Sequence, residues 1–186
     1  MNPSILNVLL KFRKYQYAFS SDTQGVFLTI GIDEKDRDYL RYFWFQNEND
    51  SKSYKILRMT RMPFGVTSSP VIFAATIKFH IRKYSQDQEY HETSEMLNSA
   101  LYVDNLFYGA NTVDKVLNLS QSAVEILKDA NINLRKFKTN SNYLKSLWLE
   151  RDISVARESN EHPIKVLEII WNTVEDTFKL DVQPLF

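Results

Sequence analysis

The stretch ALYVDNLFYG, residues 100–109, places two short polar residues between two apolar runs. Asp104 and Asn105 suit a two-residue turn, because both residue types tolerate positive φ and form local hydrogen bonds. The flanking runs are therefore predicted to pair as antiparallel strands. A carboxylate at such a tip is also able to hold a metal ion, so the stretch predicts a hairpin and leaves its chemistry to the rest of the chain.

The composition is that of an ordinary globular protein, with 186 residues of which 44% are hydrophobic. No run approaches the roughly 20 apolar residues that span a bilayer. In the N-terminal stretch the charges follow the short apolar run, which is the reverse of a secretory signal. We therefore expect an intracellular protein, cytoplasmic or nuclear, without a membrane partner.

Cysteine is absent, which excludes disulfides and thiolate metal sites, and the three histidines are scattered. Any metal ion would therefore need carboxylate ligands. The net charge of zero conceals an asymmetry, because residues 1–84 carry a charge of +6 and residues 85–186 carry −6. The basic half could contact phosphates, although a solvated protein face is the ordinary role of any single Lys or Arg.

The predicted elements give an α+β protein. After a short opening helix, strand character is found at residues 26–32, 39–45 and 54–60. Helices are predicted at residues 68–84, where Pro70 suits the first turn, and at residues 112–130, where apolar residues share one face. A polar loop is expected at residues 85–93, and a second hairpin at residues 165–171 and 177–182. This order predicts a mainly antiparallel sheet with helices packed on one face.

Asp22 is the other candidate carboxylate. It lies in FSSDTQGVFLTI, just before the strand predicted at residues 26–32, and would therefore sit at the rim of the sheet. The alternative, which spacing alone favours, is that Asp22 caps a turn together with Ser20 and Ser21. Two aspartates at strand ends are a weak indication of a metal site.

A series of segments follows the order and spacing of the motifs of one protein family. The segments are Asp22–Ile30, Asp36–Phe45, Arg61–Ile81, Tyr102–Asn105, Asn133–Asn140 and Val166–Trp171. They resemble the segments of reverse transcriptases, most closely those of Pao/BEL-type LTR retrotransposons. The segment with Pro63-Phe64-Gly65 is similar to the family's Pro-Phe-Gly-Leu-X-X-Ser-Pro loop and is the most specific match. The segment Tyr102–Asn105 resembles the Tyr-X-Asp-Asp hairpin.

The resemblance implies a polymerase palm-like fold, with an antiparallel sheet, helices packed on one face, partial fingers and no complete thumb. It implies a single truncated reverse transcriptase-like domain over residues 1–186. Within it, residues of about 15–140 would form the fingers and palm core, and residues 141–186 a primer-grip-like hairpin region. The remainder of a retrotransposon polyprotein is expected as a partner.

The implied activity is RNA-directed DNA synthesis, in which dNTPs are added to the 3′-hydroxyl of a primer on an RNA or DNA template. Two Mg²⁺ or Mn²⁺ ions carry out this chemistry in the family, and Asp22 and Asp104 would bridge them. Lys136 would neutralise or protonate the departing pyrophosphate. Read alone, Lys136 would be assigned to the surface, and Arg135 and Lys138 are near enough to compete for the same role.

The resemblance also implies residues that bind the nucleotide and the nucleic acid. Phe27 would be the aromatic gate that collides with a ribose 2′-hydroxyl, and Phe64 and Gly65 would lie beside the incoming nucleotide. The alternatives are a core Phe and an ordinary Pro-Phe-Gly turn. Nucleic-acid contacts would be made by Arg58, Arg61 and Trp171.

Three positions depart from the family pattern. Asn105 stands where the family has a third aspartate, which removes a negative charge from a site that concentrates it. Gly25 replaces a helix-forming residue, and Glu168 replaces a glycine of the primer-grip hairpin. We therefore expect weak or absent activity. The alternatives are a non-catalytic remnant or co-opted interaction module, and an unrelated α+β protein with a fortuitous hairpin.

Overall fold

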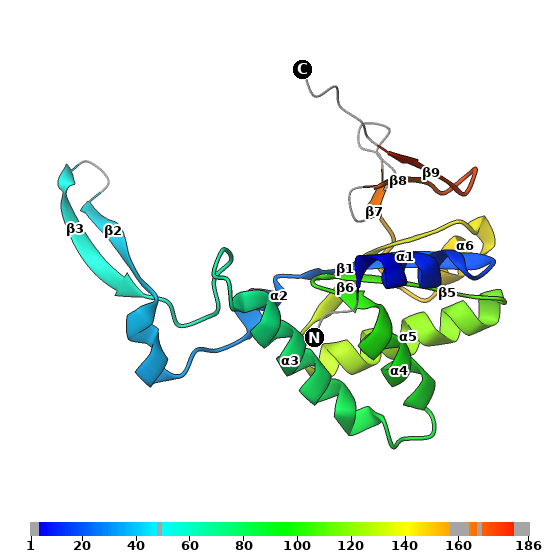
Figure 1. Cartoon of the computed structure of the whole chain (residues 1–186), viewed down its shortest axis with the longest axis horizontal. Coiled ribbons are helices and arrows are strands. Elements are labelled where there is room, and N and C mark those ends of the chain that lie inside the picture. The colour runs from blue at the N-terminus through cyan, green and yellow to red at the C-terminus, as the bar shows by residue number, and fades with distance from the viewer. Residues whose placement is uncertain (1–3, 48–49, 157–163, 167–168, 181–186) are drawn as a thin grey trace.

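The computed structural model describes residues 4–47, 50–156, 164–166 and 169–180, and Figure 1 shows their arrangement. A four-stranded sheet in the order β4-β5-β1-β6 forms the centre of the body. Every neighbouring pair in this sheet is antiparallel. The strands are β1 (Tyr17–Gln24), β4 (Leu101–Tyr102), β5 (Asn105–Ala110) and β6 (Asn133–Thr139).

Helices cover one face of this sheet. Figure 1 shows three of them below the strands, namely α3 (Ser69–Ile81), α4 (His91–Ala100) and α5 (Val113–Asp129). The shorter α6 (Asn142–Glu150) adds Trp148, which packs against Phe19 and Phe137 of the sheet. These side chains belong to one buried apolar cluster that joins the sheet to the helices. The α+β architecture with helices on one face, predicted from the sequence, is confirmed.

The two long helices begin and end near the predicted residues. The Thr112 side chain accepts a hydrogen bond from the Lys115 backbone N–H at 3.3 Å and so caps α5. After α5, Asn131 adopts a left-handed φ of 56° and ends the helix. Helix α3 begins at Ser69 and carries a proline in its first turn, and a 3-10 helix (Arg82–Tyr84) continues it.

The region predicted as a strand at residues 26–32 is different in the structure. It contains a single helical turn, α2 (Val26–Thr29), and the strand lies earlier, at β1. Gly25 explains the difference, because its φ of 60° turns the chain out of the extended conformation and into the helix. Val26 and Phe27 are still buried, so their apolar character was not specific for a strand.

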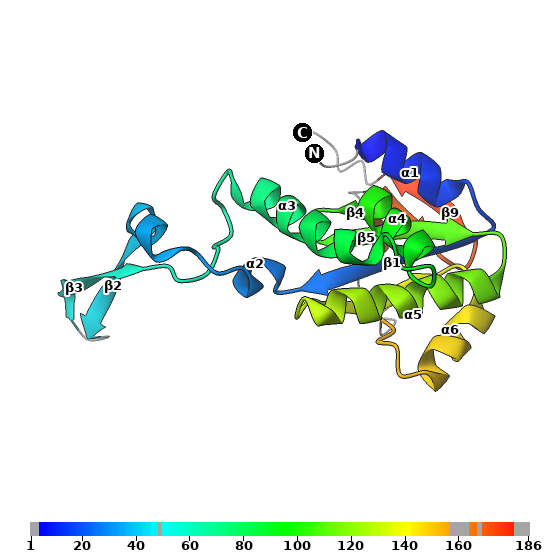
Figure 2. The ribbon, with the colours of Figure 1, turned by 90° about the horizontal axis from the view of Figure 1, so that it is seen from below.

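The strands predicted at residues 39–45 and 54–60 form a separate hairpin. Strands β2 (Arg41–Asn47) and β3 (Asp50–Arg58) pair with each other, with Phe43 opposite Ile56. Figures 1 and 2 show this hairpin projecting from the body, beyond the 3-10 helix Glu34–Tyr39. Its side chains are largely exposed, including Phe43, Trp44 and Tyr54. The hairpin therefore adds nothing to the central sheet.

The other face of the sheet is partly covered by helix α1 (Ile5–Arg13), which packs there with β8 (Ile169–Asn172) and β9 (Thr177–Leu180). Strand β7 (Ile164–Val166) pairs with β8. The Phe12 and Trp171 rings meet edge to face with centroids 4.9 Å apart. The hairpin predicted near the C-terminus is confirmed for β8 and β9, whereas Glu168 lies outside the described residues.

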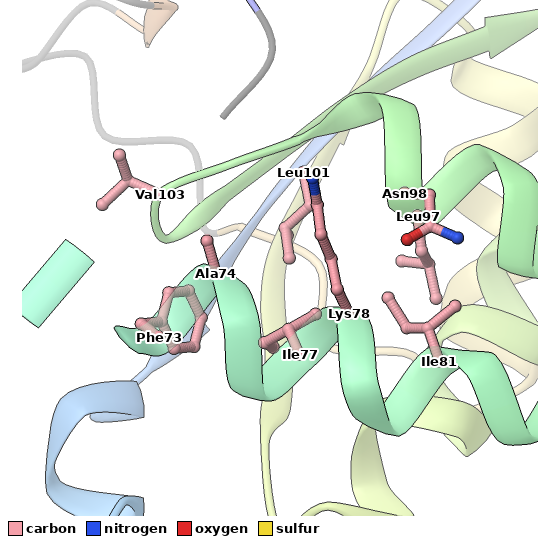
Figure 3. Close-up of a pocket in the computed structure, with 9 residues that line it drawn as sticks. All are labelled: Phe73, Ala74, Ile77, Lys78, Ile81, Leu97, Asn98, Leu101 and Val103. Carbon is pink, nitrogen blue, oxygen red and sulfur yellow. The ribbon is translucent and has the colours of Figure 1, made fainter. Parts of the chain in front are cut away.

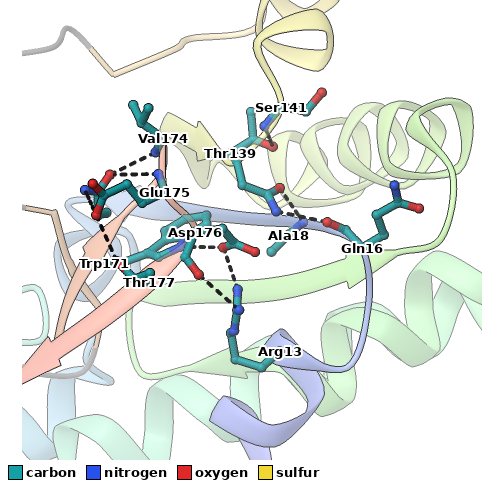
Figure 4. A network of polar contacts seen from close by, with 12 residues as sticks. Arg13, Gln16, Ala18, Thr139, Ser141, Trp171, Val174, Glu175, Asp176 and Thr177 are labelled. Carbon is teal, nitrogen blue, oxygen red and sulfur yellow. Dashed lines mark hydrogen bonds and ion pairs between the residues drawn. The ribbon is translucent and has the colours of Figure 1, made fainter.

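Polar contacts fix this arrangement, as Figure 4 shows. Arg13 forms an ion pair with the Asp176 carboxylate, which also accepts a hydrogen bond from the Trp171 indole at 3.0 Å. Nearby, Asn140 accepts from the Ala18 N–H and donates to the Gln16 carbonyl, each at 2.9 Å. The end of β6 is thereby tied to the start of β1. No helix in the described part of the chain is long and apolar enough to cross a membrane.

Candidate active site

Asp22 and the hairpin tip meet at one end of the central sheet. Asp22 lies near the end of β1 and pairs with Asn105, the first residue of β5. Its neighbour Thr23 fixes the tip, since both the backbone N–H and the side-chain hydroxyl of Thr23 donate to the Asp104 carbonyl at 2.8 Å. The fold therefore brings Asp22 on β1 next to the hairpin that carries Asp104, although the two aspartates are 82 positions apart in the sequence.

The turn of the hairpin is one residue earlier than the sequence suggested. Tyr102 pairs with Asn105, so the two turn residues are Val103 and Asp104. Val103 has a left-handed φ of 52°, which is a strained conformation for a β-branched residue. The turn thus presents Asp104 at its tip and places Asn105 in the strand.

The hairpin also rests on α3 through an apolar contact region, which Figure 3 shows. Val103 and Leu101 line a small pocket with residues of α3 and α4, among them Phe73 and Ile77. This pocket has a volume of about 20 Å³, enough for little more than one water molecule. It therefore positions the turn and is too small to be a ligand site.

Asn105 donates a hydrogen bond to the neighbouring carboxylate. Its side-chain nitrogen lies 2.7 Å from Asp104 Oδ1. An aspartate at this position would only accept hydrogen bonds and would repel Asp104. The Asn105 amide instead donates a hydrogen bond that occupies one oxygen of the Asp104 carboxylate. The substitution therefore changes both the charge and the hydrogen bonding of the site.

Two cationic side chains contact the Asp22 carboxylate. Arg135 Nε lies 3.1 Å from Oδ1, and Lys136 Nζ lies 3.1 Å from Oδ2. The Asp22 side chain is 26% exposed, so water screens these ion pairs less than it would on an open surface. Lys138 is further along β6, and burial lowers the pKa of its ammonium group, with Lys136 nearby adding to the decrease.

The oxygen atoms of Asp22, Asp104 and Asn105 suit a divalent cation that needs only a few protein ligands. Among the described residues no group of three or more His, Asp or Glu side chains converges. Asp22 and Asp104 supply carboxylate oxygens, and Asn105 could add its amide oxygen. Because Mg²⁺ is bound through one or two carboxylates and completes its shell with water or phosphate, the two aspartates fit this ion, with less negative charge than three would provide.

The predicted nucleotide-binding residues gather next to α3. The Phe27 ring is buried and lies between Phe64, 4.7 Å away edge to face, and Phe73, 5.4 Å away. Phe64 is 65% exposed, and the φ of 85° at Gly65 turns the loop around it. The Ser69 hydroxyl donates to the Pro63 carbonyl at 2.9 Å and holds this loop on the helix.

The three predicted nucleic-acid contacts lie apart. Arg61 donates to the Thr29 carbonyl at 3.1 Å and joins the loop to the end of α2. Arg58, at the base of the β2-β3 hairpin, pairs with Asp38 at 3.0 Å. Trp171 is only 1% exposed, so its side chain supports the C-terminal hairpin from inside rather than facing a ligand.

Sequence reasoning missed the contacts by which two residues organise this site. Thr23 fixes the hairpin tip, and Arg135 holds one oxygen of Asp22. Arg135 had a signal in the sequence, because it adjoins Lys136 in a motif that resembles the family. The signal of Thr23 was only its position next to Asp22.

The family described as reverse transcriptase (RNA-dependent DNA polymerase) matches residues 3–170 of the chain. The chain belongs to the reverse transcriptase family. No curated protein sequence matches it.

Solved reverse transcriptase structures share the fold. The foamy viral protease-reverse transcriptase in complex with dsDNA superposes with a TM-score of 0.60 at 16% identity, over 98% of this chain. The foamy viral protease-reverse transcriptase in complex with an RNA/DNA hybrid superposes with a TM-score of 0.58 at 17% identity, over 91% of this chain. This reverse transcriptase domain spans 30% and 18% of those two chains, respectively.

Proposed function

We propose that this chain is the palm region, with part of the fingers, of an RNA-directed DNA polymerase from a Pao/BEL-like LTR retrotransposon. The carrying observation is the pairing of Asp22 with the Asp104–Asn105 hairpin, with Thr23 fixing the Asp104 backbone. The membership in the reverse transcriptase family supports the reaction class, and the order of the six sequence segments supports the lineage. The partners are a primer on an RNA or DNA template, dNTPs and the remainder of a polyprotein.

Asp22 and Asp104 would hold Mg²⁺ or Mn²⁺. When bound, a pair of such ions activates the primer hydroxyl and neutralises the triphosphate. Asp22 lies on β1 and Asp104 in the turn before the neighbouring strand β5, so both are carried by the central sheet, which is a suitable support for a site that must keep its geometry. Intracellular location, cytoplasmic or nuclear, follows from this function as part of the same proposal.

Residues of the chain would bind the remaining groups. Phe27 is the candidate for the aromatic gate that excludes a 2′-hydroxyl, and because its ring is buried against Phe64 and Phe73, the exposed Phe64 would have to move before the ring could meet the sugar. The loop at Phe64 and Gly65 would lie against the base or the sugar. Lys136 is the candidate for the pyrophosphate, and Arg58 and Arg61 are cations within reach of phosphates once they leave their present partners.

The activity is expected to be weak because Asn105 replaces an aspartate. The amide removes a full negative charge and donates a hydrogen bond to Asp104, and both effects lower the affinity of the site for cations. Electrostatic stabilisation of the transition state falls with the charge that holds the ions.

A second candidate function is a non-catalytic module that keeps the palm fold. Both aspartates have internal partners in the structure, because Arg135 and Lys136 contact Asp22 and Asn105 contacts Asp104. A site satisfied in this way is stable without a metal ion. Saturable Mn²⁺ binding that is lost on Asp22→Ala supports the polymerase, and the absence of any binding supports the module.

Primer extension tests the first proposal directly. The chain, its Asn105→Asp variant and an Asp22→Asn/Asn105→Asp double variant are given an RNA template, a DNA primer and dNTPs. We expect slow extension by the natural chain, an increase of about tenfold or more in the single variant, and none in the double variant, which keeps the restored acid but lacks Asp22. Extension by the double variant would contradict the role of Asp22, and equal rates of the natural chain and the single variant would contradict the impairment.

A further inference from the structure

A bulge in β6 directs two consecutive side chains toward one carboxylate. Successive residues of a regular strand point to opposite faces, so Arg135 and Lys136 would diverge. The register of β1 with β6 shifts here, because Asp22 pairs with Arg135 whereas Ser20 pairs with Lys138. Two residues of β6 therefore oppose one of β1, and Lys136 takes a left-handed φ of 53°. This backbone conformation brings both cations to Asp22.

Each carboxylate oxygen then has its own cation. Arg135 Nε contacts Oδ1 and Lys136 Nζ contacts Oδ2, both at 3.1 Å. Arg135 is 37% exposed and Asp22 26%, so solvent screens this group only in part. A left-handed lysine is strained, and the ion pair with Asp22 offsets part of this strain.

We propose that Arg135 and Lys136 form a resident cation pair that competes with divalent metal ions for Asp22. The metal-free site is then already neutral, because the charges of Arg135 and Lys136 balance those of Asp22 and Asp104. A metal ion binds only by displacing Lys136 from Oδ2 and by overcoming repulsion from Arg135. This inference rests on the proposed function, because it takes Asp22 as a metal ligand. Displacement also frees Lys136, so its ammonium group becomes available for pyrophosphate only after metal has bound.

The size of the effect follows from electrostatics. Removing one positive charge about 6 Å from a bound dication, at an effective dielectric constant of about 60, favours binding by a factor of about 3 to 30. The charge of the residue at position 136 therefore sets the metal concentration that the site requires. A purely structural role of the pair, which joins β6 to β1, would instead change stability and leave metal affinity unaltered.

Mn²⁺ binding, followed by electron paramagnetic resonance of the free ion, tests the proposal at constant ionic strength. Lys136→Gly keeps a residue that favours the left-handed backbone and removes the charge, and Arg135→Gln removes the second charge. We expect the dissociation constant to fall about 3-fold to 30-fold in each. Lys136→Arg keeps the charge, and Lys83→Gln removes an exposed charge after α3, so both should bind like the natural chain.

The Asp22→Asn variant distinguishes failure of the proposed metal site from failure of the proposed competition by Arg135 and Lys136. Mn²⁺ binding that survives Asp22→Asn overturns the metal site of the proposed function. If binding is lost in Asp22→Asn but Lys136→Gly and Arg135→Gln bind like the natural chain, the metal site stands and the competition is overturned.

A measurement on the unaltered protein covers the case in which a variant does not fold. The rate at which an amine-reactive reagent labels Lys136 is measured by mass spectrometry with and without Mn²⁺, with Lys83 as the internal reference. We expect faster labelling of Lys136 relative to Lys83 as Mn²⁺ saturates the site. A ratio that stays constant through saturation overturns the proposal.

Discussion

At the scale of single residues, the pairing of β1 with β5 leaves no room for a side chain at Gly109. A Cβ added there would lie 2.6 Å from the Tyr17 carbonyl oxygen and 3.2 Å from the Tyr15 Cβ. The obstructing oxygen belongs to the backbone of the neighbouring strand, so it moves only if the sheet moves. Gly109 therefore permits the close approach of the two strands that position Asp22 and Asn105.

Gly109→Ala is expected to lower the free energy of unfolding by about 1–3 kcal/mol, because the added methyl group forces the strands apart. Urea denaturation measures this change. Gly31→Ala is the matched control, since its added Cβ would meet only Arg61 Nη1 at 3.7 Å, an ordinary contact distance. Equal destabilisation by the two variants would contradict the packing argument.

The ion pair between Arg58 and Asp38 reduces the availability of Arg58 for its predicted contact with nucleic acid. Hydrogen bonds from Arg58 and then Arg41 hold the pKa of the Asp38 carboxyl below its ordinary value of 3.8. A phosphate must therefore compete with Asp38 for Arg58. Because the pKa of Asp38 is lower in the folded state than in the unfolded state, the ion pair stabilises the folded protein at pH values above the unfolded pKa. This stabilisation disappears as the pH falls through the lower folded-state pKa.

Arg58→Gln is expected to raise the pKa of Asp38 toward 3.8, because its largest stabilising contact is lost. A carbon-13 NMR titration of the carboxyl group measures it. Arg37→Gln serves as the control, since Arg37 donates to the Ile32 carbonyl and not to Asp38. An unchanged Asp38 titration in Arg58→Gln would show that the pair does not persist in solution.

At the scale of elements, the sequence predicted those parts whose signals are local. Helix α5 has a capping Thr112 and an apolar face, and both determine its start and its orientation. The strand predicted at residues 26–32 was wrong, because Gly25 takes a left-handed conformation and turns this apolar run into a helical turn. Helix α4 was missed, although Thr93, Met96, Leu97 and Ala100 are buried at helical spacing.

The site shows the same division between local and long-range information. The family motifs pointed to Asp22 and Asp104 from short segments. The contact of both Arg135 and Lys136 with Asp22 could not be predicted from the sequence. It depends on a bulge in β6 that forms where this strand pairs with β1, more than 100 residues earlier in the chain. Strand alternation alone would have placed these two side chains on opposite faces.

The β2-β3 hairpin is expected to be dispensable for the folding of the body. Its strands pair only with each other among the described strands, and Phe43 and Trp44 are 70% and 58% exposed. Replacing residues 41–58 with a short Gly-Ser loop should shift the melting temperature of the remainder by less than about 4 °C, the shift that corresponds to about 1 kcal/mol in a domain of this size. Circular dichroism measures it. Loss of cooperative unfolding would show that the hairpin supports the body.

At the scale of the whole molecule, helix α1 and the β8-β9 hairpin, which are far apart in the sequence, meet on one face of the sheet. Phe12 of α1 is buried against Trp171 and Phe107, and Arg13 pairs with Asp176 above them. The N-terminal helix and the C-terminal hairpin therefore form one apolar cluster on this face. Any movement of the hairpin involves both ends of the chain.

Phe12→Ala is expected to destabilise the protein by about 3–5 kcal/mol and to expose Trp171. In a Trp44→Phe background, which removes the exposed indole, the tryptophan emission should shift to longer wavelength while Trp148 stays buried. Leu10→Ala on the same helix is the control, since Leu10 is 61% exposed. An unshifted emission in Phe12→Ala would contradict the packing of α1 on the hairpin.

The strand order β4-β5-β1-β6 also has a consequence for biosynthesis. Strand β1 lies between two partners, β5 and β6, that come far later in the chain. At translation rates of about 5–20 residues per second, β1 is synthesised roughly 6 to 23 seconds before residue 139, so for that time it lacks its partner β6. The strand that carries Asp22 is thus synthesised well before both of its neighbours, which makes it the natural segment for a chaperone to protect.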